Sequence, residues 1–327
     1  MQILVTGGAG YIGSQTCKEL YQSGFEPICV DNLSTGNISA VKWGPIEIGD
    51  IRNSEFLDYV FRKYSINAVI HFAASAYVGE SHSNPILYFS NNIHGTCNLI
   101  ESMIRNKVHK IIFSSSCATF GESETGLIHE NSFQNPINTY GFTKLASEKL
   151  IINLGEIGEL NYAILRYFNA AGADPDLDLG EMHFPETHII PLALDALIGN
   201  KVFTINGSDF DTLDGTAIRD YIHVKDLAQA HISALKKLID SHNSFQVNLG
   251  SGVGTSILDI VKYLETLNPS FRYKFAQRRI GDPGILIADN DFAVKYLSWS
   301  PENSNIASII ESSLKWECYR RNMTGNQ

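Results

Sequence analysis

The sequence lacks the features of secreted scaffolds, membrane proteins and common metal sites. Its five cysteines are widely spaced and include no CxxC, which argues against a disulfide framework or a cysteine zinc site. No apolar run approaches the roughly 18–20 residues that a membrane helix needs, and the histidines show no HExxH or other ligand spacing. The chain opens directly on the strand-like run Gln2–Thr6, so we expect no signal peptide, a cytoplasmic protein, no membrane contact and no metal.

Positive charge is also scarce. The 327 residues include 25 Lys and Arg against 35 Asp and Glu, a formal net charge of −10. Because no basic stripe is available to meet a phosphate backbone, we expect no nucleic-acid partner, although single arginines can still hold a small phosphate ligand. The composition, 44% hydrophobic and 18% charged, is that of a globular protein and excludes a disordered chain.

The first half of the chain alternates short apolar runs with segments of helical periodicity. This alternation predicts a parallel sheet with helices on both faces. The fold class that follows is α/β, a Rossmann-type doubly wound parallel sheet. Strands are expected near 2–6, 26–30, 46–48, 67–72, 109–114 and 161–166, and helices near 11–23, 53–64, 84–106 and 140–156.

The pattern loosens in the second half, where Gly, Pro and Asp crowd the sequence after residue 169. We therefore divide the chain into region 1–169, which holds the main sheet, and a smaller C-terminal α/β region, 170–327. Runs 219–222 and 245–248 could return as strands to the main sheet. Helices are expected near 188–199, 225–239, 256–267 and 305–320.

The first strand runs into a glycine-rich turn that a helix follows. Gly8, Gly10 and Gly13 form a GxGxxG, and Gly7 adds a GxxGxxG. Such glycines let the backbone approach a pyrophosphate, and the helix N-terminus attracts the anion. Asp31, which ends the second strand, suits the ribose of NAD and would repel the 2′-phosphate of NADP. The pattern predicts an NAD site in region 1–169, with an ordinary glycine-rich turn as the alternative.

The pattern YxxxK occurs three times, and position has to decide between the matches. On a helix the two side chains share a face, so the ammonium can lie beside the phenol. Tyr59 lies on a helix far in sequence from any strand-end hydroxyl. Tyr221 lies in an expected strand, where residues four apart are separated by about 13 Å. The matches are Tyr59/Lys63, Tyr140/Lys144 and Tyr221/Lys225.

The match at Tyr140 opens a helix, and the preceding strand ends in three serines, of which Ser116 is the last. Strand carboxyl ends line the ligand crevice of an open parallel sheet, so Ser116 can meet both Tyr140 and a substrate hydroxyl. A phenol with a pKa near 10 is a poor base, and a neighbouring cation such as Lys144 favours the phenolate. We therefore predict Ser116, Tyr140 and Lys144 as the catalytic group.

Ten sequence blocks resemble the extended short-chain dehydrogenase/reductase family, and within it the UDP-glucose 4-epimerases. They run from residue 2 to about 300, and RDYIHV and YFNxxGA are more specific than the glycine turn. The resemblance implies an NAD that stays bound through turnover, a UDP-sugar substrate bound by region 170–327, and a homodimer formed through the helices near 84–106 and 140–156. The blocks are TGGAGYIG (6–13), DNLSTG (31–36), GDIRN (49–53), HFAA (71–74), VGES (78–81), NN (91–92), SSSCATFG (114–121), NPINTYGFTK (135–144), RYFNAAGA (166–173) and DGTAIRDYIHVKDLA (214–228).

The resemblance also implies roles for individual residues. Tyr140 is the base, Ser116 is its hydrogen-bond partner, and Lys144 lowers the pKa of Tyr140 and holds the nicotinamide ribose. For Asp50, near the adenine, an ordinary strand-end aspartate is the alternative. The predicted cofactor contacts are Gly7, Gly10, Tyr11, Ile12, Gly13, Asp31, Asn32, Leu33, Ser34, Thr35, Gly36, Asp50, Ile51, Phe72, Ala73, Ala74, Asn91, Tyr140, Lys144 and Phe168. The predicted substrate contacts are Ser116, Tyr140, Asn169, His188, Ile189, Asn206, Arg219, Arg279, Asp282 and Leu286.

The implied reaction fits these residue types. Tyr140 takes the proton of the sugar 4-hydroxyl while hydride passes from C4 to NAD, and the 4-keto sugar turns over and takes the hydride back on its other face. Arg219 and Arg279 suit the diphosphate because guanidinium pairs well with phosphate oxygens, although each could be a surface salt-bridge arginine. His188 could equally be a plain helix-start histidine.

Alternatives stay open on the substrate and the reaction. Leu286 is intermediate between the large aromatic that excludes 2-acetamido groups in relatives and the small residue that admits them. UDP-glucose is favoured, therefore, and UDP-GlcNAc and UDP-pentoses remain alternatives. A dehydratase or decarboxylase needs an acid after the strand-end hydroxyl, where this chain has Cys117, which we expect to be a buried thiol. A non-catalytic regulator would lack the tyrosine, and a net dehydrogenase would exchange its NAD.

Overall fold

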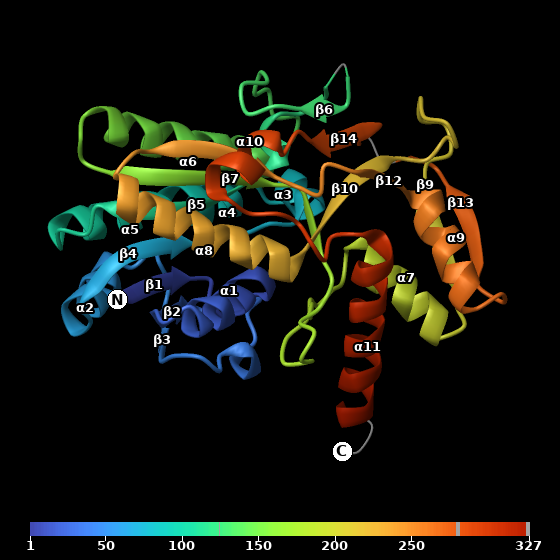
Figure 1. The fold of residues 1–327 in the computed structure, drawn as a ribbon, viewed down its shortest axis with the longest axis horizontal. Helices are drawn as coiled ribbons and strands as arrows, with labels where there is room; N and C mark the ends of the chain where they lie inside the picture. The colour runs from blue at the N-terminus through green and yellow to red at the C-terminus, as the bar shows by residue number, and fades with distance from the viewer. Residues whose placement is uncertain (124, 279–281, 325–327) are drawn as a thin grey trace.

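The centre of the molecule is a seven-stranded sheet in the order β11-β7-β5-β4-β1-β2-β3, with every neighbouring pair parallel (Figure 1). This computed structural model describes residues 1–123, 125–278 and 282–324. The strands of the first half lie within two residues of the predicted ranges. They are β1 (Gln2–Thr6), β2 (Glu26–Asp31), β3 (Ile46–Ile48), β4 (Ile66–His71), β5 (Lys110–Ser116) and β7 (Asn161–Tyr167).

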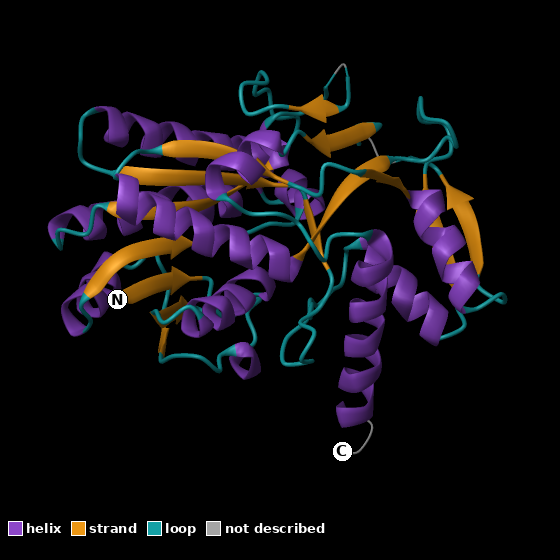
Figure 2. Cartoon of the chain, viewed as in Figure 1, coloured by secondary structure: helices purple, strands orange, loops and turns teal. Residues whose placement is uncertain are grey.

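Helices cover both faces of this sheet, as the ribbon in Figure 2 shows. Successive strand residues point to opposite faces, so Ile3 and Val5 of β1 pack into one apolar core and Leu4 packs into the other. The doubly wound α/β prediction is confirmed. The first core includes residues of α1 (Tyr11–Gln22), α8 (Val224–Ser241) and α10 (Asp291–Leu297), and the second those of α2 (Ser54–Lys63), α5 (Gly95–Arg105) and α6 (Thr139–Glu156).

The helix predicted at 84–106 consists of three segments. They are α4 (Pro85–Tyr88), η2 (Phe89–His94) and α5, and η2 is a π-helix. Such widened turns are frequent at functional sites, and this one carries Asn91 and Asn92. The sequence pattern missed α3 (Val78–Ser83) and α10, which are too short to show a clear helical period. The short 3₁₀ turns are η1 (Ile38–Ala40) and η3 (Cys117–Thr119).

The two runs expected to rejoin the main sheet behave differently. The run at 245–248 does so, since β11 (Phe245–Leu249) pairs with β7. The prediction for 219–222 is wrong, because β10 (Ile218–His223) lies in a second sheet. The Asp220 carboxylate of β10 accepts hydrogen bonds from the backbone of Ser251, Gly252 and Ala288, and Ala288 belongs to a strand of the second sheet. The partners of β10 are β8 (Asn169–Ala171), β12 (Gly254–Ser256) and β14 (Ile285–Ala288), and β14 also pairs with β6 (Leu127–Ile128).

The remaining elements of the second half form a separate core at the right of Figure 1. Helices α7 and α9 and strand β9 meet in it, together with the start of α11, and the exposed strand β13 pairs in parallel with β9. Because α8 and β11 lie with the main sheet, the division near residue 169 separates the chain less cleanly than the sequence pattern implies. These elements are α7 (Ile189–Ile198), β9 (Val202–Asn206), α9 (Ile257–Leu267), β13 (Arg272–Ala276) and α11 (Ile306–Thr324).

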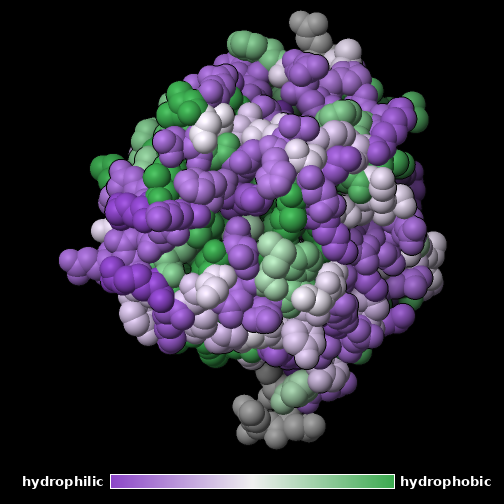
Figure 3. Space-filling model, turned by 60° about the vertical axis from the view of Figure 1, so that its left-hand side comes forward, coloured by the Kyte–Doolittle hydropathy of each residue, from purple (hydrophilic) through white to green (hydrophobic). Residues whose placement is uncertain are grey.

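Polar side chains cover most of the face that Figure 3 draws. On the face that Figure 3 draws, hydrophobic residues lie in small groups among hydrophilic ones. Over residues 1–123, 125–278 and 282–324, every helix is too short or too polar to pass through a lipid bilayer.

Candidate active site

The glycine turn between β1 and α1 requires its glycines. Gly7 has a φ of +73°, and a Cβ there would lie 2.7 Å from the backbone nitrogen of Ala73. A Cβ on Gly13 would collide with the carbonyl oxygen of Gly7, and the Gly10 amide donates to that same oxygen at 3.1 Å. The turn is therefore a tight cradle of bare backbone at the carboxyl edge of the sheet, and α1 begins directly after it. This arrangement fits a dinucleotide pyrophosphate.

Asp31 lies beside this cradle at the end of β2. Its carboxylate accepts hydrogen bonds from the Ala9 amide at 3.0 Å and the Leu33 amide at 2.8 Å. Burial raises the pKa of Asp31, and these two hydrogen bonds lower it. Gly36 packs so closely that a Cβ there would lie 2.8 Å from an Asp31 oxygen. The predicted ribose-binding run 31–36 is thus folded around its own carboxylate, next to the glycine turn.

The predicted adenine contact, Asp50, lies just beyond β3. It accepts a hydrogen bond from Asn32 Nδ2 at 3.0 Å, which brings two of the predicted cofactor residues together. The Arg52 side chain binds the same carboxylate at 2.7 and 2.9 Å and holds the pKa of Asp50 well below its usual range. The side chain of Tyr11, another predicted cofactor contact, points toward the loop after β8, where its hydroxyl donates to the Gly172 carbonyl at 2.5 Å.

The three predicted catalytic residues meet where β5 ends and α6 begins. Ser116 is the last residue of β5, and its side chain hydrogen-bonds that of Tyr140 in the first turn of α6. Lys144, one turn further along α6, donates to the Ser114 carbonyl at 2.8 Å. The side chain of Asn138 caps the helix through the Gly141 amide at 2.8 Å. The cap and the strand end together fix the catalytic group in place.

Burial dominates the electrostatics of this group. Tyr140 is 8% exposed and Lys144 is 4% exposed. Burial raises the pKa of Tyr140 well above its usual range, with a further rise from Tyr167, and the hydrogen bond from Ser116 acts in the opposite direction. Burial lowers the pKa of Lys144 to about 8, and Glu148 partly offsets that effect. The phenol therefore keeps its proton unless positive charge lies beside it.

A buried polar network that the sequence pattern did not reveal lies behind the predicted catalytic residues. Glu148, one turn beyond Lys144 on α6, accepts hydrogen bonds from Arg166 of β7 at 2.8–3.1 Å and from the hydroxyl of Ser115. On the other face of the sheet, where Tyr167 packs against the first core, the hydroxyls of Ser114 and Tyr167 are 2.7 Å apart. These contacts join β5, β7 and α6 around the catalytic end of the sheet. The spacing 140, 144, 148 on one helix face is the signal that could have identified Glu148.

The loop after β4 is tied to α6 through the π-helix. Asn91, a predicted cofactor contact, donates to the Ser75 hydroxyl at 2.9 Å. Its neighbour Asn92, which was not predicted, accepts from the Ser75 amide at 2.8 Å and donates to the Thr143 hydroxyl at 2.9 Å. The predicted residues Phe72, Ala73 and Ala74 lie on this loop between β4 and Ser75.

Two predicted substrate residues, Arg219 and Leu286, lie opposite each other in the β10·β14 pair. Burial lowers the pKa of Arg219, and the nearby Tyr221 and Asp282 partly offset this lowering. Leu286 packs with Phe168 in a small apolar cluster that Cys117 also contacts, so it lies near the end of β5. Burial raises the pKa of the Cys117 thiol to about 12, which agrees with an unreactive cysteine.

The other predicted substrate residues are more scattered. The side chain of Asn169 donates to the Asp220 carbonyl at 2.9 Å, whereas Asn206 ends β9 and Ile189 begins α7. His188 precedes α7 and pairs with Glu181 and Glu186 rather than with other predicted contacts. Burial lowers the pKa of His188, but these carboxylates outweigh it and raise that pKa to about 10. Arg279 lies outside the described residues.

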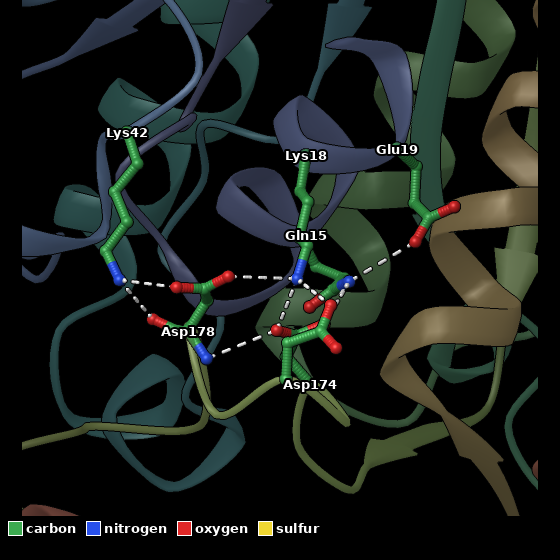
Figure 4. A network of polar contacts seen from close by, with 7 residues as sticks. Gln15, Lys18, Glu19, Lys42, Asp174 and Asp178 are labelled. Atoms are coloured by element: carbon green, nitrogen blue, oxygen red, sulfur yellow. Dashed lines mark hydrogen bonds and ion pairs between the residues drawn. The ribbon is translucent and has the colours of Figure 1, made fainter. Parts of the chain in front are cut away.

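A second network holds the later part of α1 against the loop that follows β8 (Figure 4). Lys18 Nζ lies 2.6 Å from Asp174, 2.8 Å from Asp176 and 3.1 Å from Asp178. Lys42 reaches Asp178 as well, at 3.2 Å. The figure shows the carboxylates of Asp174 and Asp178 turned toward Lys18, and that of Asp178 also toward Lys42. The network fixes the segment that leads toward His188 relative to the glycine turn.

The fold and the site define an NAD-dependent enzyme. One edge of the doubly wound sheet carries the glycine cradle, the carboxylate at the end of β2 and the buried Ser-Tyr-Lys group. Nicotinamide dinucleotide chemistry requires this arrangement. Comparison with known proteins shows to which family of NAD-dependent enzymes the chain belongs. The model of the NAD dependent epimerase/dehydratase family matches residues 3–250, and the chain belongs to that family. It is an epimerase that uses NAD as its cofactor.

Similar proteins are found over the full length of the chain. A UDP-glucose 4-epimerase of Rhizobium meliloti is 44% identical over 325 residues, covering 99% of this chain and 98% of the relative. The crystal structure of UDP-glucose 4-epimerase from Brucella ovis in complex with NAD is 46% identical, with a TM-score of 0.92 and coverage of 96% and 97%. UDP-glucose 4-epimerase from Bifidobacterium longum in complex with NAD⁺ and UDP is 35% identical, with a TM-score of 0.92 and coverage of 98% and 99%.

Proposed function

We propose that the protein interconverts UDP-glucose and UDP-galactose by epimerisation at C4, with no net oxidation. The observation that carries the proposal is the buried group Ser116, Tyr140 and Lys144 at the end of β5. Cys117 follows Ser116, where a dehydratase would need an acid, and its partly buried thiol, with a pKa raised to about 12, cannot replace one. The similar proteins from Rhizobium, Brucella and Bifidobacterium, all UDP-glucose 4-epimerases, support the choice of substrate.

In the proposed mechanism, Tyr140 accepts and returns the proton, and Ser116 orients the Tyr140 side chain. The phenolate of Tyr140 accepts the proton of the sugar 4-hydroxyl and later returns it, while the Ser116 hydroxyl donates a hydrogen bond to the phenolate. Bound NAD supplies a reversible hydride acceptor that lets the sugar pass through a 4-keto form. Lys144, with a pKa of about 8, is mostly protonated at neutral pH and holds positive charge on the same helix face as Tyr140.

The substrate side of the proposal requires a firmly held nucleotide and a sugar that can turn over. Arg219 is a buried guanidinium with Asp282 nearby, and it suits a diphosphate oxygen. Leu286, its neighbour across β10·β14, would border the sugar. Because leucine fills less space than an aromatic ring, UDP-GlcNAc and UDP-pentoses remain within the proposed substrate class.

The test is an epimerisation assay without added cofactor. Purified protein is incubated separately with UDP-glucose, UDP-GlcNAc and UDP-xylose, and the anomeric protons are followed by NMR. We expect UDP-galactose to appear from UDP-glucose, because the NAD stays bound through turnover. If no epimer forms in any tube and NADH accumulates only when NAD is supplied, the protein is a dehydrogenase instead.

We also propose that two copies associate through the faces of α4, η2 and α6. Ile86, Phe89 and Phe142 are exposed there, and the rings of Phe89 and Phe142 stack with centroids 5.7 Å apart. A shallow hollow beside them is lined by His82, Phe89, Pro136, Ile137, Asn138, Thr139 and Phe142. Sedimentation velocity should give the dimer mass for the native chain and the monomer mass for Phe142→Glu. The same change at another exposed ring, Phe133→Glu, should leave the dimer intact.

A further inference from the structure

The loop between β8 and α7 gathers two histidines and two glutamates outside the catalytic group. One ligand atom each from Glu181, His183, Glu186 and His188 lies within 4.8 Å of all the others. Glu181 Oε1 is 3.0 Å from His183 Nδ1 and 2.6 Å from His188 Nδ1. Glu186 faces the same nitrogens with both of its oxygens. Its Oε2 lies 3.9 Å from His183 Nδ1, and its Oε1 lies 3.2 Å from His188 Nδ1. Four donor atoms from four residues therefore enclose one small space.

The spacing of these atoms fits a four-coordinate metal. Zinc binds histidine nitrogen and carboxylate oxygen at about 2.0–2.2 Å, so a tetrahedral site separates neighbouring donor atoms by about 3.3–3.6 Å. Glu181 Oε1 and Glu186 Oε2 lie 2.6–3.9 Å from the histidine nitrogens, distances that bracket that value. Glu186 Oε1 already accepts from the amides of Thr187 and His188 at 2.7 and 2.8 Å, which leaves its Oε2 for a metal.

The loop is also held in shape before any metal binds. The Glu181 side chain is buried, and the backbone carbonyl of Glu181 accepts a hydrogen bond from the indole of Trp316 at 3.2 Å. His183 and Glu186 are partly buried, whereas His188 is half-exposed and leaves a path from solvent. A site with buried ligands and one open side costs little ordering entropy to fill.

We propose that Glu181, His183, Glu186 and His188 form a binding site for a divalent transition metal of the zinc class. Two imidazole donors favour zinc and its neighbours over magnesium and calcium, which prefer sites made entirely of oxygen ligands. The sequence analysis expected no metal because it looked for helical spacing such as HExxH. These ligands instead follow an irregular loop spacing, at positions 181, 183, 186 and 188.

The metal would connect the loop to the cofactor end of the molecule. The His183 ring lies edge-on to Tyr77, with centroids 5.8 Å apart, and to Tyr11, with centroids 6.4 Å apart. Tyr11 opens α1 directly after the glycine turn, and His188 directly precedes α7. A bound ion would therefore fix α7, the loop and the glycine turn relative to one another.

The direct test is metal uptake by the full-length protein, which needs neither substrate nor turnover. Protein treated with chelator and then dialysed is titrated with Co²⁺, followed by calorimetry and visible absorption. We expect one equivalent to bind with the intense visible bands of four-coordinate Co²⁺, and Zn²⁺ to displace it. No uptake, or the weak spectrum of six-coordinate Co²⁺, would overturn the proposal.

Single variants locate the ion. His183→Gln and Glu186→Gln should each weaken Co²⁺ binding by about 100-fold or more, since loss of an outer-shell partner alone costs 10–100-fold. The control is His129→Gln, which alters an exposed histidine paired with Asp289 at 2.6 Å and should leave binding unchanged. Melting curves without metal check that each variant is folded, and one folded ligand variant suffices for the comparison. Uptake that persists in it at native affinity would contradict the assignment.

Discussion

The cofactor-facing half of the molecule and the loop at 172–188 fix their polar side chains in different ways. In the first, the backbone holds the functional group, since Asp31 is held by two amides and Lys144 by a carbonyl oxygen. In the loop, charged side chains hold one another, as Lys18 does with Asp174 and as Glu181 does with His188. Backbone anchors come with the strands and helices themselves. Side-chain anchors depend on single residues far apart in sequence and can be lost by one substitution.

The largest effect should come from removing the hydroxyl that we propose as the acid/base group, at a site whose frame the backbone holds. In Tyr140→Phe, we expect epimerisation of UDP-glucose to fall by about 10³–10⁴-fold, the upper range for a general base. The folded state should change little, because the ring stays packed and the helix cap at Asn138 is untouched. NMR of the UDP-sugar measures the rate.

The control for that substitution is Tyr59→Phe, at a second YxxxK in which Tyr59 is a half-exposed tyrosine of α2. It should keep the native rate. A Tyr140→Phe enzyme that retains more than a tenth of native activity would show that another group carries the proton.

The next effect compares the two charged networks directly. Glu148 and Arg166 are 0% and 2% exposed, so Glu148→Gln leaves a buried guanidinium without its charge partner and should destabilise the protein by about 3–5 kcal/mol. Lys18→Met also breaks a network, and it leaves the buried carboxylate of Asp174 without its ammonium. That carboxylate keeps hydrogen bonds from Gln15 and the Asp178 amide and can take up a proton, which a guanidinium cannot lose, while Asp176 and Asp178 face water. Urea unfolding of both variants should therefore give the smaller loss for Lys18→Met. Equal losses would mean that these hydrogen bonds and the proton do not offset the missing ammonium.

Much of the fold follows from the sequence because parallel strands buried on both faces are continuous apolar runs. This explains why β1, β5 and β7 lie close to their predicted ranges. The error at β10 has the converse cause. Arg219 and Asp220 interrupt the apolar pattern, and only the folded chain reveals the backbone amides that satisfy Asp220. Short helices such as α3 lack enough residues to establish a period.

The site shows the same limit. Ser116, Tyr140 and Lys144 could be predicted from a strand end and a helical spacing, which are local features. Asn92 could not, because its partners Ser75 and Thr143 come from two other elements. The four residues proposed as metal ligands escaped for a related reason, since a loop imposes no fixed period on its side chains.

Acid should expose a property that β4 and α8 share. His71, between Thr6 and Thr96, and His231, bonded to the Leu227 carbonyl, are buried, and burial lowers their pKa to about 3 and about 4. An unfolded histidine binds a proton near pH 6.5, so between pH 6.5 and 4 the unfolded chain binds more protons than the folded one. Stability therefore falls as pH falls, by up to about 1.4 kcal/mol per pH unit for each histidine.

The measurement is urea unfolding at pH 7 and pH 5. Replacing His231 in His231→Leu should reduce the loss of stability between these pH values by about 2 kcal/mol. His109→Gln, at an exposed histidine, should leave the loss as it is in the native chain. An unchanged loss in His231→Leu would mean that His231 takes up its proton in the folded state.

The smallest effect concerns Leu286, a residue of the second half of the chain whose position is fixed by backbone pairing, as the positions of Asp31 and Lys144 are fixed by backbone groups in the first half. Leu286 is fixed opposite Arg219 by the register of β14 against β10 and is 8% exposed. In Leu286→Tyr, the larger ring should narrow the proposed sugar pocket, so kcat/KM for UDP-GlcNAc relative to UDP-glucose should fall by about tenfold, or about 1.4 kcal/mol. Val253→Tyr, at an exposed position, is the control. If both substrates lose activity equally, Leu286 supports the fold of the β10·β14 pair without selecting the sugar.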